Sequence, residues 1–288
     1  MTMTDPTRPP TRVGLVQVCA GRDVGRNVTA AADLVRDAAG RGAVYVQTPE
    51  VTTLLEPDRE RLFAAIEPES GNAALERFSA LARDLGIWLH IGSMAVKLSA
   101  DKLANRAYLF DPQGRIAARY DKIHMFDVTL PAGEVYRESK NYAPGDRAPV
   151  VTLPWGQLGI TICYDLRFPY IYRALAHAGA EMLAIPSAFT VPTGTAHWHV
   201  LMRARAIETG CWVLAAAQAG EHESGRKTYG HSLIVSPWGD VIAEADGVHP
   251  SVIVADVDWG AVLEARRRIP SLEHDRPVEV FGVDATNG

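Results

Sequence analysis

Short apolar runs rich in β-forming residues alternate with helical runs over almost the whole chain, and this alternation constrains the fold more than any other feature. Such alternation is typical of an α/β domain, in which helices cover β-sheets. The strand candidates are residues 13–18, 43–47, 87–91, 107–110, 158–162, 182–185, 212–216, 232–235 and 252–257. Periodicity alone therefore predicts an α/β fold.

The helical runs between these strands carry apolar residues at helical spacing. Residues 72–85 place Leu75, Phe78 and Leu81 on one face and end at Gly86, which is a common helix terminator. Residues 28–39 and 195–208 have a similar pattern. Because no repeat or linker interrupts the chain, we expect a flexible segment over residues 1–11 and a single domain over residues 12–288.

The overall composition excludes several functional classes. The chain has 288 residues, of which 47% are hydrophobic and 22% charged, so it can bury a large core. A formal net charge of −5, with no Lys/Arg run that compensates for it, argues against a nucleic-acid partner. No stretch approaches 18 uninterrupted apolar residues, and the first residues lack the apolar core of a signal peptide. We therefore expect a cytoplasmic protein with no membrane partner.

The cysteine and histidine spacing favours neither disulfides nor metal binding. The three cysteines form no CxxC pair, which fits a reducing compartment. His197 and His199 are the closest pair of metal-type ligands, but they lie two residues apart in a helical run, where side chains point to different faces. The sequence therefore predicts no metal ion.

Cys163 stands where an apolar strand breaks into a turn, directly before a helix that we expect to begin at Pro169. Backbone N–H groups of such a turn can lower the pKa of a thiol and bind an oxyanion. Taken alone, a free cysteine is more often a small packing residue. Glu50 and Lys122, which end two other strand-like runs, would likewise be surface charges if taken alone.

Together these three side chains supply every group that acyl transfer to sulfur requires. Glu50 can take the thiol proton, Cys163 can attack a carbonyl carbon, and the Lys122 ammonium can stabilise the oxyanion. The backbone N–H of Tyr164 is the natural second oxyanion donor. Residues 125–146 form a long stretch rich in turn formers, and loops of this length inside a domain are usually functional.

The segments "QTPE", "YDKIHMFD" and "GITICYDLRFP" resemble the three signature segments of the nitrilase, or carbon–nitrogen hydrolase, superfamily. In that superfamily a Glu-Lys-Cys triad cleaves non-peptide C–N bonds, and the segments map onto Glu50, Lys122 and Cys163. The segment "ESKNYAPGD" matches a second glutamate of the family at Glu138, which is implied to orient the lysine and the substrate. The resemblance also implies a four-layer α-β-β-α sandwich that commonly pairs into a homodimer.

The resemblance further implies a small-molecule amide as the substrate. The C-terminal half is similar to the amidase branch that includes deaminated glutathione amidases and ω-amidases. We therefore expect hydrolysis of a carboxylate-bearing amide to an acid and ammonia through a cysteine thioester, with deaminated glutathione as the first choice and no metal or organic cofactor. Candidate substrate-binding residues are Arg167, Arg173, Arg203 and His231, although Arg203 can equally form structural ion pairs and His231 can equally be a structural histidine.

Three alternatives stay open at this point. One is an ω-amidase acting on α-ketoglutaramate, and another is a carbamoylase or nitrilase of the same superfamily. The third is a binding protein that keeps the fold without catalysis, although its expected mark, a damaged triad, is absent here. The triplet His197-Trp198-His199 also departs from the family, because relatives often have glutamate in place of His199, and this departure leaves the exact amide open.

Overall fold

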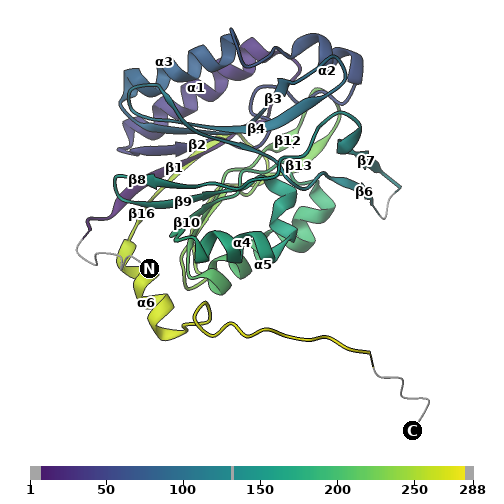
Figure 1. The fold of residues 1–288 in the computed structure, drawn as a ribbon. Helices are drawn as coiled ribbons and strands as arrows, with labels where there is room; N and C mark the ends of the chain where they lie inside the picture. The colour runs from purple at the N-terminus through teal and green to yellow at the C-terminus, as the bar shows by residue number, and fades with distance from the viewer. Residues whose placement is uncertain (1–7, 131–132, 283–288) are drawn as a thin grey trace.

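The computed structural model describes residues 8–130 and 133–282 (Figure 1). One sheet contains, in spatial order, β16 (Ser251–Val257), β1 (Thr11–Gln17), β2 (Tyr45–Gln47), β3 (Trp88–Lys97), β4 (Leu103–Phe110) and β5 (Ile116–Asp121). A second sheet contains β15 (Val241–Glu244), β14 (Leu233–Val235), β11 (Trp212–Ala215), β10 (Met182–Ala184), β9 (Gly156–Ile160) and β8 (Val150–Leu153). The central strands run parallel in both sheets: β1, β2 and β3 in the first, and β9, β10 and β11 in the second. The remaining strand pairs are antiparallel.

The two sheets pack face to face, and helices cover both outer faces (Figure 1). Helices α1 (Val24–Gly40) and α3 (Ala73–Leu85) lie on the first sheet, while α4 (Pro169–His177) and α5 (Val191–Thr209) lie on the second. The hydrophobic cluster between the sheets includes Leu15 and Leu109 from the first sheet and Ile160 from the second. The predicted four-layer α-β-β-α sandwich is therefore confirmed.

Local sequence signals account for the helix ends that position these layers. At the start of α3 the side chain of Asn72 accepts hydrogen bonds from the N–H groups of Ala74 and Leu75, and the helix ends at Gly86, whose φ is 65°. A left-handed φ of this kind favours glycine because a side chain there is strained. The buried face of α3 carries Phe78, as the apolar spacing predicts.

The structure adds elements that the sequence patterns did not predict. Two hairpins pair β6 (Asp127–Thr129) with β7 (Val135–Arg137) and β12 (Ala219–Glu221) with β13 (Lys227–Tyr229). The remaining elements are α2 (Arg59–Ala65), α6 (Trp259–Arg268) and the 3-10 turns η1 (Glu138–Lys140) and η2 (Cys163–Arg167). The strands that escaped prediction are short or lie at or near sheet edges, where polar and exposed residues obscure the apolar run.

The beginning of the domain is anchored at the described residues nearest the N-terminus. Arg8 donates to the carbonyl oxygen of Trp155 (2.7 Å) and forms an ion pair with Glu181 (2.6 Å). Strand β1 begins at Thr11, one residue before the predicted domain boundary, and the rest of the segment predicted to be flexible, residues 1–7, lies outside the described residues. Among the described residues, no helix has the length and apolar character that crossing a membrane requires.

Candidate active site

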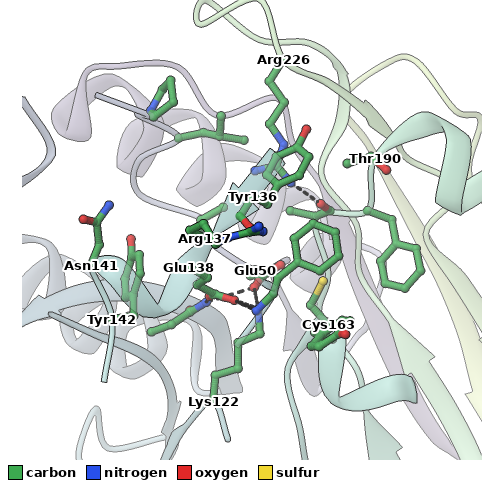
Figure 2. Close-up of a pocket in the computed structure, with 18 of the residues that line it drawn as sticks. Glu50, Lys122, Tyr136, Arg137, Glu138, Asn141, Tyr142, Cys163, Thr190 and Arg226 are labelled. Atoms are coloured by element: carbon green, nitrogen blue, oxygen red, sulfur yellow. Dashed lines mark hydrogen bonds and ion pairs between the residues drawn. The ribbon is translucent and has the colours of Figure 1, made fainter. Parts of the chain in front are cut away.

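A cavity of about 330 Å³ opens where the ends of β2, β5 and β9 come together, and Glu50, Lys122 and Cys163 all line it. Figure 2 shows these three side chains converging with Glu138 in the middle of the cavity. Glu50 follows β2, Lys122 follows β5, and Cys163 follows β9. The structure thus brings the four predicted catalytic side chains into one site, although they are far apart in the sequence.

Cys163 occupies a tight turn after β9, as the sequence predicted. Its φ of 48° is in the left-handed region, which is rare for a residue with a side chain. The backbone N–H of Cys163 donates to the carbonyl oxygen of Pro186 (2.9 Å), which fixes the turn. Among the described residues the N–H of Tyr164 has no acceptor, so it is available as a donor beside the sulfur.

Asp165 explains how this turn is held against the Lys122 segment. It is fully buried, and its carboxylate accepts hydrogen bonds from the hydroxyl of Tyr120 (2.6 Å) and the backbone N–H of Ile162 (2.9 Å). It also accepts from the backbone N–H of His124 (3.0 Å), on the segment that follows Lys122. One carboxylate therefore ties two of the catalytic segments together.

A glycine permits the close approach of the segment that carries Glu50. Gly92 lies in the irregular middle of β3, where the register with β4 shifts. A Cβ atom at Gly92 would lie 2.1 Å from the carbonyl oxygen of Thr48 and 2.4 Å from the Cβ of Pro186. Any side chain at position 92 would therefore push apart the turns that precede Glu50 and surround Cys163.

Lys122 is buried between two carboxylates. Its Nζ donates to Oε1 of Glu50 (2.8 Å) and to Oε2 of Glu138 (2.8 Å). Asn105 on β4 donates to both carboxylates, at 3.0 Å and 3.1 Å, and the N–H of Phe126 donates to Glu138 (2.7 Å). These bonds fix the ammonium in one position, where it can face a developing negative charge.

Burial and neighbouring charges shift the pKa values of Glu50 and Lys122 in opposite directions. Burial acts to raise the pKa of Glu50, but the adjacent Lys122 ammonium holds the pKa of this carboxyl below its usual value. Burial acts to lower the pKa of Lys122, whereas Glu138 and Glu50 raise that pKa well above the ordinary range. The resting site therefore contains an ammonium ion and an ionised Glu50.

The pKa of Cys163 corrects one expectation from the sequence. Burial and the charge of Glu50 raise the pKa of the Cys163 thiol, and the opposing effect of Lys122 is smaller. Cys163 begins the 3-10 turn η2, and α4 begins six residues later, at Pro169, as predicted. The N-terminus of α4 is therefore not directly beside Cys163 in the chain. The resting nucleophile is consequently a thiol beside a carboxylate base, whereas the sequence predicted that the backbone N–H groups of the turn would lower the pKa of this thiol.

The predicted substrate-binding residues fall into two groups. Tyr164 and Arg167 line the cavity. Arg173 forms an ion pair with Asp275 and donates to the carbonyl oxygen of Ser271, because it lies on the face of α4 that meets the C-terminal segment. Arg173 is not part of the cavity lining found in the described residues. We therefore leave it out of the proposed substrate site.

His231, Arg203 and His199 also lie outside the lining found in the described chain. Nδ1 of His231 and Nε2 of His199 both contact the carboxylate of Glu244, at 2.7 Å and 2.9 Å. Arg203 donates to the carbonyl oxygen of Gly239 (2.7 Å). Because His199 lies outside this lining, its departure from the family gives no reason to change the proposed amide, and Arg203 and His231 are not included in the proposed substrate site.

Sequence reasoning missed two arginines and an asparagine that line the cavity. Arg137 comes from the long stretch 125–146 that was predicted to be functional, so a signal for it existed. Arg226 comes from the β12–β13 hairpin, and its guanidinium lies over the ring of Tyr136 and donates to the carbonyl oxygen of Ala188 (2.7 Å; Figure 2). Asn105 lies in the interior of β4, and no local pattern distinguished it.

A cysteine beside a carboxylate and a fixed ammonium, at the strand ends of an α-β-β-α sandwich, is the arrangement of a hydrolase that works through a cysteine nucleophile. The sequence profile described as "Carbon-nitrogen hydrolase" matches residues 12–267 of this chain. The chain therefore belongs to the carbon–nitrogen hydrolase family and is an enzyme that acts on C–N bonds.

Individual relatives agree with this membership. The chain is 40% identical to a deaminated glutathione amidase from Bos taurus over 277 residues, covering 94% of this chain and 83% of the relative. The crystal structure of the C. elegans NitFhit protein matches with a TM-score of 0.88 and 33% identity, covering 95% of this chain and 66% of that one. An amidase from Nesterenkonia sp. AN1, described with acrylamide added at its active-site cysteine, matches with a TM-score of 0.75 and 28% identity, covering 90% of this chain and 98% of that one.

Proposed function

We propose that the chain is an amidase that hydrolyses a small carboxylate-bearing amide through a thioester on Cys163. The observation that carries this proposal is the arrangement of Lys122, which holds its ammonium between Glu50 and Glu138 in the same cavity as the Cys163 thiol. A carboxylate base, a cysteine and a fixed cation are the groups that acyl transfer to sulfur requires.

In the proposed first step Glu50 takes the thiol proton while the sulfur attacks the amide carbon. Lys122 and the N–H of Tyr164 stabilise the oxyanion, and Glu50 then returns the proton to the departing nitrogen as the C–N bond breaks. Water enters, Glu50 removes its proton, and the hydroxide oxygen attacks the thioester. The C–S bond breaks, and the sulfur recovers its proton from Glu50. Glu138 holds Lys122 in position throughout.

Deaminated glutathione is the substrate that we propose first. The B. taurus relative carries this substrate in its name, and at 40% identity it supports the same amide here. In this molecule the scissile amide nitrogen belongs to cysteinylglycine, so the proposed amine product is cysteinylglycine. Ammonia, the product expected from the sequence, would leave only from a primary amide such as α-ketoglutaramate.

A substrate comparison tests the proposal directly. Purified enzyme is incubated with deaminated glutathione, α-ketoglutaramate, an N-carbamoyl amino acid and an aliphatic nitrile. The released 2-oxoglutarate, ammonia and carbon dioxide are then quantified. We expect the highest kcat/KM for deaminated glutathione. A higher value for α-ketoglutaramate would favour the ω-amidase alternative, and turnover of none of the four would contradict the amidase proposal.

Arg226 is the group that we propose to bind a substrate carboxylate. Arg226 lines the cavity, and its buried Nε has no hydrogen-bond partner among the described residues, so its guanidinium keeps an unused donor. A charged hydrogen bond contributes about 1.5–3 kcal/mol, so Arg226→Met should raise KM for a carboxylate-bearing amide by about 10- to 100-fold. The change in KM should be small for an amide that lacks a carboxylate.

Arg173→Met is the matched control for this prediction, because Arg173 is a guanidinium on a nearby element that does not line the cavity. We expect its kcat and KM to stay within about threefold of the wild-type values. Arg226 would be removed from the proposed substrate site by either of two results. One is an equal rise in KM for Arg226→Met and Arg173→Met, and the other is a rise in KM for Arg226→Met that is equal for amides with and without a carboxylate.

The pH dependence of kcat/KM follows from the shifted groups. The pKa of Glu50 lies below its ordinary value of 4.5, so the base stays ionised as the pH falls to that value. The pKa values of Cys163 and Lys122 lie above their ordinary values of 9.0 and 10.5, so neither loses its proton below pH 9. We expect a flat profile from about pH 5 to 9. A rise or fall of kcat/KM with its midpoint between pH 6 and 8 would contradict these assignments, provided that circular dichroism shows the protein to be folded over this range.

The homodimer that the resemblance implies, like the cytoplasmic location, stays a proposal. The exposed face of α5 carries the apolar side chains of Val200 and Ile207, which are 68% and 52% exposed. Paired helices from two copies would remove these side chains from water.

A further inference from the structure

Three side chains with metal-binding atoms converge outside the active-site cavity. His199 comes from α5, His231 from the link between β13 and β14, and Glu244 from the end of β15. Nε2 of His199 lies 2.9 Å and Nδ1 of His231 lies 2.7 Å from the same Oε1 of Glu244. One donor atom from each residue lies within 4.8 Å of the others, so three distant segments present their ligand atoms at one point.

The backbone holds His231 in an unusual conformation at this point. Its φ is 55°, a left-handed value that is rare for a residue with a side chain. Its N–H donates to the carbonyl oxygen of Asp246 (3.2 Å), and its own carbonyl oxygen accepts from Nε1 of Trp198 (2.8 Å). A Cβ atom at Gly247 would lie 2.6 Å from Nε2 of His231, so the ring fits only beside a glycine. The imidazole is therefore fixed before any ligand arrives.

Solvent can reach the cluster. The side chains of His199, His231 and Glu244 are 34%, 30% and 35% exposed, so each is half-buried with a polar edge towards water. An ion held by the three side chains would keep a further coordination position open to water. Such an open position is typical of three-ligand zinc sites.

The donor set discriminates between classes of ion. Two imidazole nitrogens and one carboxylate oxygen form a set that Zn²⁺ and related transition metals prefer, whereas Mg²⁺ and Ca²⁺ prefer oxygen ligands. Ligand atoms around a tetrahedral Zn²⁺ are about 3.3 Å apart, so the two nitrogen–oxygen distances need to lengthen by only about half an ångström. Rotation of the half-exposed side chains of His199 and Glu244 can supply this change while His231 stays in place.

We propose that His199, His231 and Glu244 form a binding site for a divalent transition-metal ion of the Zn²⁺ class. In the metal-free site the contacting nitrogen of each imidazole can donate an N–H hydrogen bond to Glu244. On binding, Nε2 of His199 and Nδ1 of His231 give lone pairs to the metal, and each neutral ring carries its proton on the other nitrogen. The bound ion would link α5 to the edge of the second sheet. This inference does not depend on the proposed amidase activity.

The test is a titration of the tag-free protein with ZnCl₂. Calorimetry measures the binding, and the change in Tm measures the stabilisation. We expect one Zn²⁺ per chain at this site and a rise in Tm, because the ion binds the folded cluster. His199→Gln and Glu244→Gln should each weaken this binding at least tenfold. His231→Asn should do the same, and asparagine tolerates the left-handed φ at this position. MgCl₂ should produce no comparable Tm shift.

Two control variants make the result specific. His177→Gln also removes an imidazole from an exposed contact with a carboxylate, that of Asp275, but no second imidazole of the described residues contacts that carboxylate. We expect it to bind Zn²⁺ as the wild type does. Cys163→Ala identifies any zinc held by the nucleophile, because such binding would be lost in that variant and retained in His199→Gln. Unchanged zinc affinity in both His199→Gln and Glu244→Gln, or the absence of binding to wild type at micromolar zinc, would overturn the proposal.

Discussion

Cys163→Ala is expected to lower kcat for amide hydrolysis by at least about 10⁴-fold while the protein stays folded. Without the sulfur no thioester can form, and the remaining groups can only polarise a bound amide. Cys163 is 7% exposed and small, so losing its sulfur should reduce the free energy of unfolding by only about 1 kcal/mol. The measurement is product formation at saturating substrate, with urea unfolding of the same preparation.

Cys19→Ala is the matched control for this substitution. Cys19 is also a free cysteine, but it is half-buried and does not line the cavity found in the described residues. Its kcat should stay within about twofold of wild type. Acid-quenched wild type should also show, by mass spectrometry, an acyl adduct on the peptide that contains Cys163. If Cys163→Ala keeps more than about 1% of the wild-type kcat, or if the adduct forms elsewhere, the thioester mechanism is wrong.

The sequence could predict the elements that lie in the centre of each sheet. Strands such as β10 and β11 are buried on both faces, so their residues form apolar runs that stand out from the surrounding sequence. The edge strand β15 is mostly exposed, and its composition resembles that of a loop. The 3-10 turn η2 was also hidden, because a turn of this type depends on the fully buried side chain of Asp165 and leaves no periodic pattern.

The candidate catalytic groups were predictable for a different reason than the substrate-binding groups. Glu50 and Cys163 follow central strands, and the ends of such strands meet at one edge of a layered α/β domain. Arg173 is close to Cys163 in the sequence but points to the C-terminal segment. Arg226 reaches the cavity from a hairpin more than 60 residues after Cys163. Sequence proximity was therefore a poor guide to which arginines face the substrate.

Lys122→Met is expected to reduce the free energy of unfolding at pH 7 by about 3–5 kcal/mol, in addition to abolishing activity. The side chain of Lys122 is 2% exposed, and those of its partners Glu50 and Glu138 are 6% and 13% exposed. Methionine fills a similar volume but leaves two neighbouring carboxylates in the protein interior without a cation. Removing one partner of a buried ion pair usually costs this much, because the remaining charge loses its compensation. Urea unfolding, with reversibility checked by dilution, gives the value.

The pH dependence of this loss separates a charge effect from a packing effect. In wild type the pKa of Glu50 is lowered, so its stabilising contribution is present above pH 4.5 and is lost as the pH falls through the lower folded-state value. Without Lys122 the burial of Glu50 favours the protonated form of its carboxyl, so the folded variant takes up a proton that the unfolded chain does not. The difference in the free energy of unfolding between the variant and wild type should therefore become smaller as the pH falls from 7 to 5. Adding Glu138→Gln to Lys122→Met should recover part of the lost stability, because one buried charge is removed.

Lys102→Met provides the matched control for the loss of Lys122. Its ammonium donates to the carbonyl oxygen of Ser139 (2.7 Å) at an exposed position and lies between no carboxylates in the contacts described. We expect a change within about 1 kcal/mol that does not depend on pH between 5 and 7. A deficit for Lys122→Met that is equally independent of pH, with no recovery from Glu138→Gln, would mean that packing alone explains the loss. The ammonium would then contribute nothing to stability by neutralising its two carboxylates, and its fixed position between them would have to be explained by catalysis alone.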